Sequence, residues 1–321
     1  MESLAVRPIG GYFPLTLVQG KEYYPELIRL NTSRNALEYI LILKGYTKVY
    51  FPYYTCEVLL EPLIRLNIPY QFYKINPNLE PILDFEVGPT ECLLYTNYFG
   101  LKDAVLKQLK ATIGNLIIDN AQAFFSRPLP YSDTFYSCRK FFGVPDGAYL
   151  QINTDDRLIL EKDHSADRVG HLTRSIDYGI EHSYADFITN ELCLKDNDIK
   201  SMSLLTQALL RGINYKECRN KRIENFKYLN DQLFLVNELE LFLPEGVAAM
   251  MYPLLLLKRD IRSKLIAKKI FVPTYWPNVL KWTGYKTYEH QLARYMVCLP
   301  VDHRYSLNDM EYIVNVIKKI I

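Results

Sequence analysis

The fold of this 321-residue chain is indicated first by Leu116-Ile117-Ile118-Asp119-Asn120-Ala121-Gln122. An apolar, β-prone run that ends in a carboxylate predicts a buried strand with Asp119 at its carboxyl end. In open α/β sheets, ligands bind at the carboxyl ends of the parallel strands. Asp119 is therefore a candidate ligand-binding residue, although an acid at such a point is also typical of a helix cap or a turn.

A second segment, Ser137-Cys138-Arg139-Lys140, follows another β-prone run about 20 residues further on. Its hydroxyl and amine are expected at the same sheet edge as Asp119. Pyridoxal phosphate needs these three kinds of group: an amine for its aldehyde, a carboxylate for its pyridine nitrogen, and donors for its phosphate. A lysine after a strand is more commonly a solvated amine, so the prediction depends on the combination and order of the groups.

Apolar β-prone runs alternate with helical patterns between about residues 31 and 152, which is typical of a mostly parallel sheet covered by helices on both faces. A helix is expected from Ser33 to about Lys44, with Gly45 as its C-terminal stop. The expected strands cover residues 49–51, 70–73, 92–95, 116–118, 134–136 and 148–152. The sequence therefore predicts an α/β fold.

The second half of the chain predicts a different organisation. Residues 155–200 are more polar, and we expect a connecting segment with helices near the mouth of the site or at a subunit interface. The elements expected after it are helices at 202–210 and 218–233, a strand at 252–257, a helix at 260–268, strands at 270–272 and 296–299, and a final helix capped by Ser306. This order predicts a large cofactor-binding domain over residues 1–215 and a smaller C-terminal α+β domain over residues 216–321.

The composition excludes several classes of partner. Lysine and arginine number 38 against 36 acids, a net charge of +2, so no nucleic-acid or anionic-membrane surface is expected. The six cysteines form no Cys-x-x-Cys pair and no metal-ligand spacing with the histidines, which indicates reduced thiols and no metal site. Residues 1–11, which include Glu2 and Arg7, lack the apolar core of a signal peptide, and no run approaches a membrane span of about 20 residues. We therefore expect a cytoplasmic protein.

Around its two most informative segments, the chain resembles the DegT/DnrJ/EryC1/StrS family of pyridoxal-phosphate-dependent sugar aminotransferases. Residues 119–122 match the family's Asp-x-Ala-Gln, and residues 137–140 match its serine-to-lysine segment, followed by Asp146-Gly147-Ala148 in place of acid-Gly-Gly. Four further segments are similar to segments of the family. Asn31 to Leu37 resembles the phosphate-binding Ser-Gly-Thr-x-Ala-Leu, and Pro52 to Thr55 resembles Pro-x-x-Thr. Asn97 to Gly100 resembles a strand-end turn, and Leu299-Pro300 with Ser306 to Met310 resembles the closing strand and helix. The resemblance implies a fold type I aminotransferase architecture.

The resemblance also implies a role for each matched residue. Lys140 would be the Schiff-base lysine, Asp119 the partner of the pyridinium, and Gln122 a hydrogen-bonding neighbour of the cofactor ring. Ser137 and the backbone amides of Ser33 and Arg34 would bind the phosphate, the amides at a helix N-terminus where an anion is favoured.

Three departures from the family pattern bear on these roles. Ser33 replaces a glycine of the phosphate segment, Ala148 replaces the second glycine of the late pair, and Cys56 replaces an aromatic residue that often follows Pro-x-x-Thr. Tyr54 is the candidate that would supply an aromatic face for the cofactor in place of Cys56.

The implied activity is transfer of an amino group from glutamate to a keto-sugar, expected to be nucleotide-linked and used for polysaccharide or antibiotic sugars, by a homodimer. Two alternatives stay open: a catalytically silent or regulatory protein with the same fold, and another pyridoxal-phosphate reaction such as dehydration. Lys140 argues against dehydration, because the family's dehydratases carry histidine there. Tyr275-Trp276 and Asp302-His303-Arg304 are interpreted as packing and loop residues outside the site.

Overall fold

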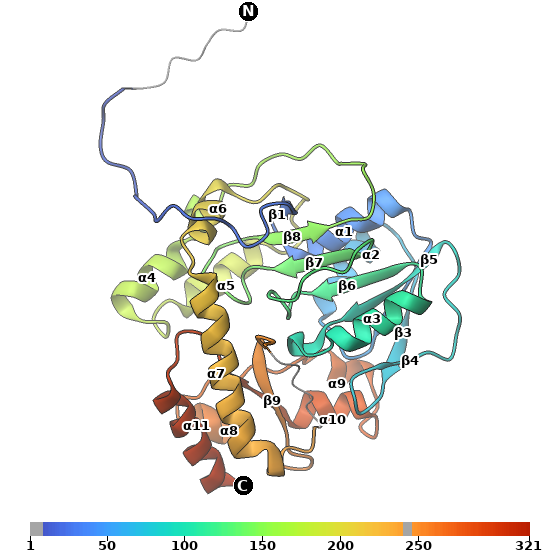
Figure 1. The fold of residues 1–321 in the computed structure, drawn as a ribbon, viewed down its shortest axis with the longest axis vertical. Helices are drawn as coiled ribbons and strands as arrows, with labels where there is room; N and C mark the ends of the chain where they lie inside the picture. Colours follow the sequence, from blue (N-terminus) through green and yellow to red (C-terminus); the bar gives the residue numbers. More distant parts are fainter. Residues whose placement is uncertain (1–8, 240–245) are drawn as a thin grey trace, which may run out of the picture.

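An eight-stranded sheet forms the centre of the larger part of the molecule (Figure 1). The computed structural model describes residues 9–239 and 246–321, so Glu2 and Arg7 lie outside it. The strand order is β1-β8-β7-β6-β5-β2-β3-β4. The strands are β1 (Ile28–Leu30), β2 (Lys48–Pro52), β3 (Tyr70–Ile75), β4 (Pro81–Ile82), β5 (Glu91–Thr96), β6 (Leu116–Asn120), β7 (Asp133–Ser137) and β8 (Ala148–Gln151).

Strands β7, β6, β5, β2 and β3 run parallel, whereas β8, β1 and β4 pair antiparallel at the two sides of the sheet. The expected mostly parallel sheet is therefore confirmed. All six strands predicted from residues 49–152 are present, because their apolar runs are buried between two helical layers. The short edge strands β1 and β4 were not predicted.

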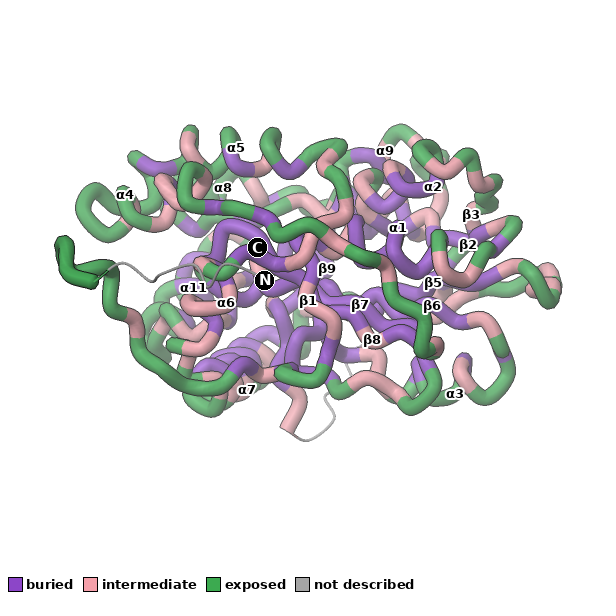
Figure 2. Tube along the Cα trace, turned by 90° about the horizontal axis from the view of Figure 1, so that it is seen from above, coloured by how far each residue is buried: buried purple, intermediate pink, exposed green. Residues whose placement is uncertain are grey.

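Helices cover the sheet on both faces. On one face, α1 (Ser33–Lys44) packs against β7 and β8, and its Leu37 and Ile40 belong to the same apolar cluster as Phe135 of β7 and Leu150 of β8. On the other, α3 (Asp103–Thr112) and α7 (Tyr215–Leu233) contribute to a second, larger cluster. Seen from above, the buried strands lie between outer segments that are largely exposed (Figure 2). Short helices between these elements are α2 (Glu61–Arg65) and four 3-10 turns at Glu57–Leu60, Tyr98–Gly100, Ala166–Arg168 and Phe234–Val236.

The helix α1 begins and ends where the sequence predicts. Thr32 is its N-cap and accepts a hydrogen bond from the Asn35 amide through its hydroxyl, with 3.2 Å between Oγ1 and N. Gly45 ends the helix with φ +61°, a left-handed conformation that glycine adopts without steric cost. The amides of the first turn are thus fixed at the carboxyl edge of the sheet.

The connecting segment expected over residues 155–200 contains two helices, α4 (Gly170–Tyr178) and α5 (Tyr184–Cys193), which pack against each other. The predicted helix at 202–210 is α6 (Leu204–Arg211), and the predicted helix at 218–233 is the longer α7. The α7 helix runs from beside the sheet into the lower half of the molecule in Figure 1.

The C-terminal part is built around two antiparallel strands, β9 (Met251–Leu255) and β10 (Met296–Pro300). Its helices are α8 (Arg262–Ala267), α9 (Val279–Trp282), α10 (Tyr288–Tyr295) and α11 (Leu307–Ile320). The predicted strand at 270–272 is wrong, because those residues form no strand. The apolar side chains of Ile270 and Val272 are buried although their backbone pairs with no strand. The final helix does begin after Ser306, whose amide donates to Asp309 Oδ2 at 2.7 Å.

The division into domains at residue 215 stays a prediction. The larger apolar cluster contains residues from both proposed domains, such as Leu116 and Leu254. Among the helices of the described residues, none combines the length and the apolar character needed to cross a membrane. All six cysteines are unpaired.

Candidate active site

Asp119 is the second-to-last residue of β6, near the carboxyl edge of the sheet, with only 5% of its surface exposed. Its Oδ1 accepts a hydrogen bond from the Ala121 amide at 2.8 Å, and its Oδ2 accepts one from the Thr96 hydroxyl at 3.3 Å. Burial raises the pKa of Asp119, and the charge of Lys140 acts in the opposite direction. The carboxyl group is therefore fixed by two hydrogen bonds, and these bonds and the charge of Lys140 favour its ionised form.

Lys140 lies in a tight turn directly after β7. Ser137 is the last residue of that strand, and the amides of Phe141 and Phe142 both donate to the Cys138 carbonyl, at 3.0 and 2.9 Å. The antiparallel return of the chain into β8 fixes both ends of this turn. The neighbouring parallel strands β6 and β7 thus deliver Asp119 and Lys140 to one place, as their positions after two buried strands predict.

The residues of these turns and the first turn of α1 line one cavity of about 300 Å³. Six of the seven predicted site residues line it: Ser33, Arg34, Asp119, Gln122, Ser137 and Lys140. The other lining residues are Thr32, Thr55, Cys56, Val58, Leu59, Ala121, Arg139, Gly147, Phe187, Glu191 and Trp276. Phe187 and Glu191 belong to α5, so the segment over 155–200 does lie at this site, as expected.

Tyr54 is the predicted site residue that the structure does not bring to this cavity. Its ring is fully buried against Tyr98 and Trp276, with centroid distances of 5.6 and 5.0 Å. The next two residues, Thr55 and Cys56, line the cavity in its place. The expectation that Tyr54 supplies an aromatic face is therefore wrong, because the chain turns after β2 and directs that ring into the core.

Trp276 is the aromatic residue that the sequence interpretation left out. It is 7% exposed and lines the cavity. Its segment is tied to the cavity wall because the Asn278 side-chain amide donates to the Thr55 carbonyl at 2.9 Å. Since more than 200 residues separate Trp276 from Thr55 in the chain, no local pattern predicts this contact.

Gln122 has an unused hydrogen-bond donor at the cavity. Its Oε1 accepts from the Phe99 amide at 2.8 Å, which fixes the side chain, while its buried Nε2 has no partner among the residues described. An unpaired buried donor costs free energy unless a ligand accepts from it. The arrangement fits a bound group with an acceptor atom, such as an oxygen on a cofactor ring.

Positive charge gathers beside the first turn of α1. Arg34 pairs with Glu61 and Arg139 pairs with Glu191. Burial and then the nearby Arg34 guanidinium lower the pKa of Arg139 to about 10. Together with the amides at the helix N-terminus and the Ser137 hydroxyl, these side chains make the cavity suitable for a phosphate.

A glycine is required on the far wall of the cavity. Gly147 has φ +116°, and a Cβ there would lie 2.9 Å from Thr206 Cγ2. The preceding Asp146 is completely buried and accepts hydrogen bonds from the hydroxyl groups of Ser203 and Thr206. The Asp-Gly pair thus anchors α6 behind the site and leaves no room for a side chain at the glycine.

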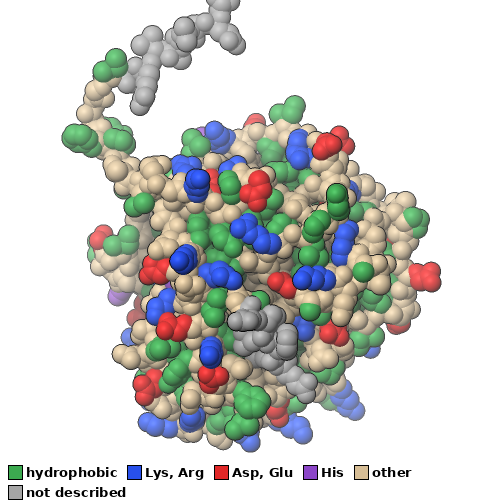
Figure 3. Space-filling model, viewed as in Figure 1, with side chains coloured by type: hydrophobic (Ala, Val, Ile, Leu, Met, Phe, Trp, Pro, Cys, Tyr) green, Lys and Arg blue, Asp and Glu red, His purple; other side chains and the backbone are tan. Residues whose placement is uncertain are grey.

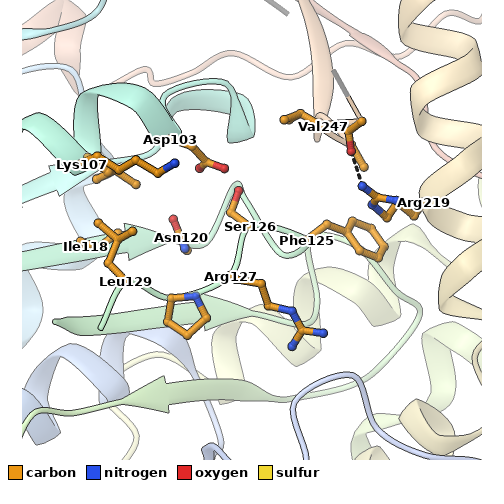
Figure 4. Close-up of a pocket in the computed structure, with 14 residues that line it drawn as sticks. Asp103, Lys107, Ile118, Asn120, Phe125, Ser126, Arg127, Leu129, Arg219 and Val247 are labelled. Carbon is orange, nitrogen blue, oxygen red and sulfur yellow. Dashed lines mark hydrogen bonds between the residues drawn. The ribbon is translucent and has the colours of Figure 1, made fainter. Parts of the chain in front are cut away.

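A different hollow, of about 370 Å³, lies beside the next residue of β6, Asn120 (Figure 4). Successive residues of a strand face opposite sides of the sheet, so the side chains of Asp119 and Asn120 line different cavities. Around this hollow Asp103 lies close to Lys107, while Arg127 and Arg219 come from other elements. On the face of the molecule shown in Figure 3, basic and acidic side chains are interspersed with apolar ones.

The chain has the fold of sugar aminotransferases of known structure. It is similar to the sugar aminotransferase CalS13 from Micromonospora echinospora, with 17% identity over 92% of this chain and 87% of that one and a TM-score of 0.64. No protein-family model and no curated protein matches the chain.

Two other solved structures are similar to the same extent. One is a DegT/DnrJ/EryC1/StrS aminotransferase from Brucella abortus, with 18% identity over 91% of this chain and 85% of that one and a TM-score of 0.62. The other is NtdA from Bacillus subtilis with bound cofactor PMP, with 14% identity over 92% and 73% of the two chains and a TM-score of 0.65. At these identities the similarity confirms the expected fold type I aminotransferase architecture.

Proposed function

We propose that this protein is a pyridoxal-phosphate-dependent sugar aminotransferase. The observation that carries the proposal is the meeting of Lys140 and a buried, hydrogen-bonded Asp119 in one cavity that also contains a helix N-terminus. Amine, carboxylate and phosphate-binding amides are the groups this cofactor needs. The fold shared with CalS13 and NtdA supports the same interpretation.

The six predicted site residues that line the cavity then each have a proposed role. The amides of Ser33 and Arg34 and the hydroxyl of Ser137 would bind the phosphate, Asp119 would pair with the ring nitrogen, and Gln122 Nε2 would donate to the ring. Bound here, pyridoxal phosphate would supply an electron sink for the carbon that carries the amino group. The Lys140 amine would attach the cofactor and then move a proton at that carbon.

The finer parts of the proposal are the substrates and the assembly. We propose glutamate as amino donor and a nucleotide-linked keto-sugar as acceptor, for polysaccharide or antibiotic sugars, and a homodimer as the active species. The name of CalS13 supports a sugar substrate. Six unpaired cysteines fit a reducing compartment, so we place the reaction in the cytoplasm.

The experiment that tests the proposal is the absorbance spectrum of the purified protein with pyridoxal phosphate, before and after borohydride, with peptide mapping of the reduced adduct. We expect a visible band that borohydride removes and a modified peptide that contains Lys140. Lys140→Ala should lose both, whereas Lys107→Ala, which changes an exposed residue of α3 outside the cavity, should keep them.

An adduct that persists in Lys140→Ala would refute the lysine assignment. A folded protein with no band would favour the silent or regulatory alternative, and a band without amino transfer from glutamate would favour another reaction of the same cofactor.

A further inference from the structure

A second cavity, of about 480 Å³, adjoins the first at the Lys140 turn. Arg139, Lys140 and Phe187 line both cavities. The second one extends along the residues after Lys140, between the α4–α5 pair and the turn at Asp302 to Arg304. A substrate that reaches Lys140 can therefore extend into this space, whose size lies within the usual range for ligand pockets.

The most unusual residue in this cavity is Arg222 of α7. It is only 2% exposed, yet in the described part of the chain its hydrogen bonds go to backbone carbonyls alone. Nη1 donates to Met250 at 2.9 Å and Ala249 at 3.4 Å, Nη2 donates to Phe141 at 3.5 Å, and Nε has no partner among residues 9–239 and 246–321. A buried guanidinium without a carboxylate is costly, so this charge is suited to an anion supplied by a ligand.

Asp302, an acidic residue that lines the same cavity, is hydrogen-bonded to a different arginine. Asp302 accepts hydrogen bonds from Arg304, with 2.7 Å between Nε and Oδ1 and 3.0 Å between Nη2 and Oδ2. This two-point pair is the strong geometry for a guanidinium and a carboxylate. Because these hydrogen bonds go to Arg304, Asp302 acts on Arg222 only through space, and among the described residues the Arg222 guanidinium has no hydrogen bond to a carboxylate.

A second unpaired atom lies in the same cavity. The His303 ring is half-buried, and its Nδ1 has no hydrogen-bond partner among the residues described. An imidazole nitrogen that carries hydrogen donates to an oxyanion. The remaining wall is largely apolar, with Phe141, Phe142 and Leu172, and suits the carbon body of a ligand better than a free inorganic ion.

We propose that this cavity is an oxyanion subsite for a substrate, in which Arg222 and His303 bind a carboxylate or phosphate group while the reacting carbon lies at Lys140. The proposal rests on the proposed function, because it assigns the reaction to Lys140. Two sources share this chemistry: the carboxylate of an amino donor and the phosphate of a nucleotide-linked acceptor.

Binding is tested directly, without turnover. Succinate mimics a dicarboxylic donor, and UDP mimics the nucleotide of an acceptor. Their affinities for the cofactor-loaded protein are measured by isothermal titration calorimetry, so that the first cavity is occupied. Wild type should bind at least one probe, and Arg222→Met should weaken its binding by about tenfold or more, because the charge-assisted hydrogen bonds to the anion are lost.

Two further variants control for folding and position. His303→Ala removes a half-buried ring and should weaken the same probe by a smaller factor. Arg219→Met, one turn earlier on α7 and lining the hollow of Figure 4, should bind the probe as wild type does. Thermal melting of each variant separates loss of binding from loss of fold.

The outcomes separate the sources and the failures. Binding of succinate alone assigns the subsite to the donor, binding of UDP alone assigns it to the acceptor, and binding of both supports a shared oxyanion site. Failure of both probes to bind wild type, or equal binding to wild type, Arg222→Met and His303→Ala, would overturn the proposal. The proposed function fails separately, through the absence of an adduct at Lys140, in which case the titration is run on the cofactor-free protein.

Discussion

The two cavities that meet at Lys140 differ in how their charged groups are satisfied. In the first, Arg34 and Arg139 each pair with a glutamate, and Asp119 accepts two hydrogen bonds from its own neighbourhood. In the second, the hydrogen bonds of Arg222 within the described part of the chain go to backbone carbonyls only, and its Nε has none there. The first cavity is organised before any ligand arrives, whereas the second contains a charge that a ligand would balance.

Substitutions in the two cavities should therefore have different effects on the protein. Changes in the first cavity should alter chemistry or cofactor binding through groups whose positions are fixed. Changes in the second should alter affinity for a substrate and leave the cofactor in place. Preorganised groups act without reorganisation during reaction, which is why the largest effects are expected in the first cavity.

The largest effect is expected for Asp119→Asn. An amide keeps the size and an acceptor oxygen but removes the charge that would pair with the cofactor's ring nitrogen. By comparison with other electrostatic contacts in active sites, we expect half-transamination with glutamate to slow by about 10²-fold or more. Stopped-flow absorbance of the cofactor band measures this rate.

Asp103→Asn is the matched control, because Asp103 lines the hollow of Figure 4 and not the first cavity. It should keep the wild-type rate. An unchanged rate in Asp119→Asn would show that the buried carboxyl is a structural residue, and the contrast between the two cavities would lose its chemical meaning.

The next effect is on stability, at the glycine wall of the first cavity. Gly147→Ala places a Cβ at φ +116° and 2.9 Å from Thr206 Cγ2, so we expect a loss of about 2 kcal/mol of unfolding free energy. Gly114→Ala meets nothing within 4 Å and should be neutral or slightly stabilising. Chemical denaturation of both variants measures the difference, and equal effects would contradict the assigned crowding.

A smaller effect on stability is expected at two helix N-caps that are both threonines. The hydroxyl groups of Thr32 and Thr287 accept the amides of Asn35 and His290 at 3.2 and 3.3 Å. Thr32→Ala and Thr287→Ala should each cost about 1 kcal/mol. Only Thr32→Ala should also weaken pyridoxal phosphate binding, because Thr32 lines the first cavity. Equal cofactor affinity in the two variants would remove α1 from the proposed phosphate site.

The first cavity was largely predictable from the sequence, for a physical reason. Asp119 and Lys140 each follow a short apolar strand, and parallel strands bring their carboxyl ends to one edge. The helix N-terminus at Ser33 is marked by a cap and an apolar periodicity that are both local in the chain. The side-chain direction of Tyr54 was not predictable, because it depends on the turn after β2 and not on a regular strand.

The second cavity was not predictable, because its parts come from distant segments. Arg222 looks like one of several basic residues on a solvated helix, yet in the fold it is buried against the backbone of Phe141 and of Ala249 and Met250, which are distant in the chain. Asp302-His303-Arg304 was interpreted as a loop outside the site, yet β10 delivers it to the same cavity. The wrong strand at 270–272 has a related cause: an apolar run shows burial but not whether the backbone pairs.

The smallest expected effect uses pH to compare the cavities. Burial lowers the pKa values of His303 and His171, which both line the second cavity, whereas burial raises the pKa of Asp119 in the first. A histidine with a lowered folded-state pKa binds fewer protons than in the unfolded chain, so its contribution falls as the pH drops below about 6.5. A carboxyl with a raised pKa responds in the opposite sense, because protonation relieves its burial.

Melting temperatures between pH 7.5 and 5 should therefore fall less steeply in His303→Gln and His171→Gln than in wild type. An added anion should have a similar effect if it occupies the second cavity, because a bound negative charge favours the protonated ring of His303. Succinate or UDP, whichever binds, should flatten the wild-type profile and leave that of Arg222→Met unchanged. A profile that both glutamine variants share with wild type would place the acid sensitivity outside this cavity.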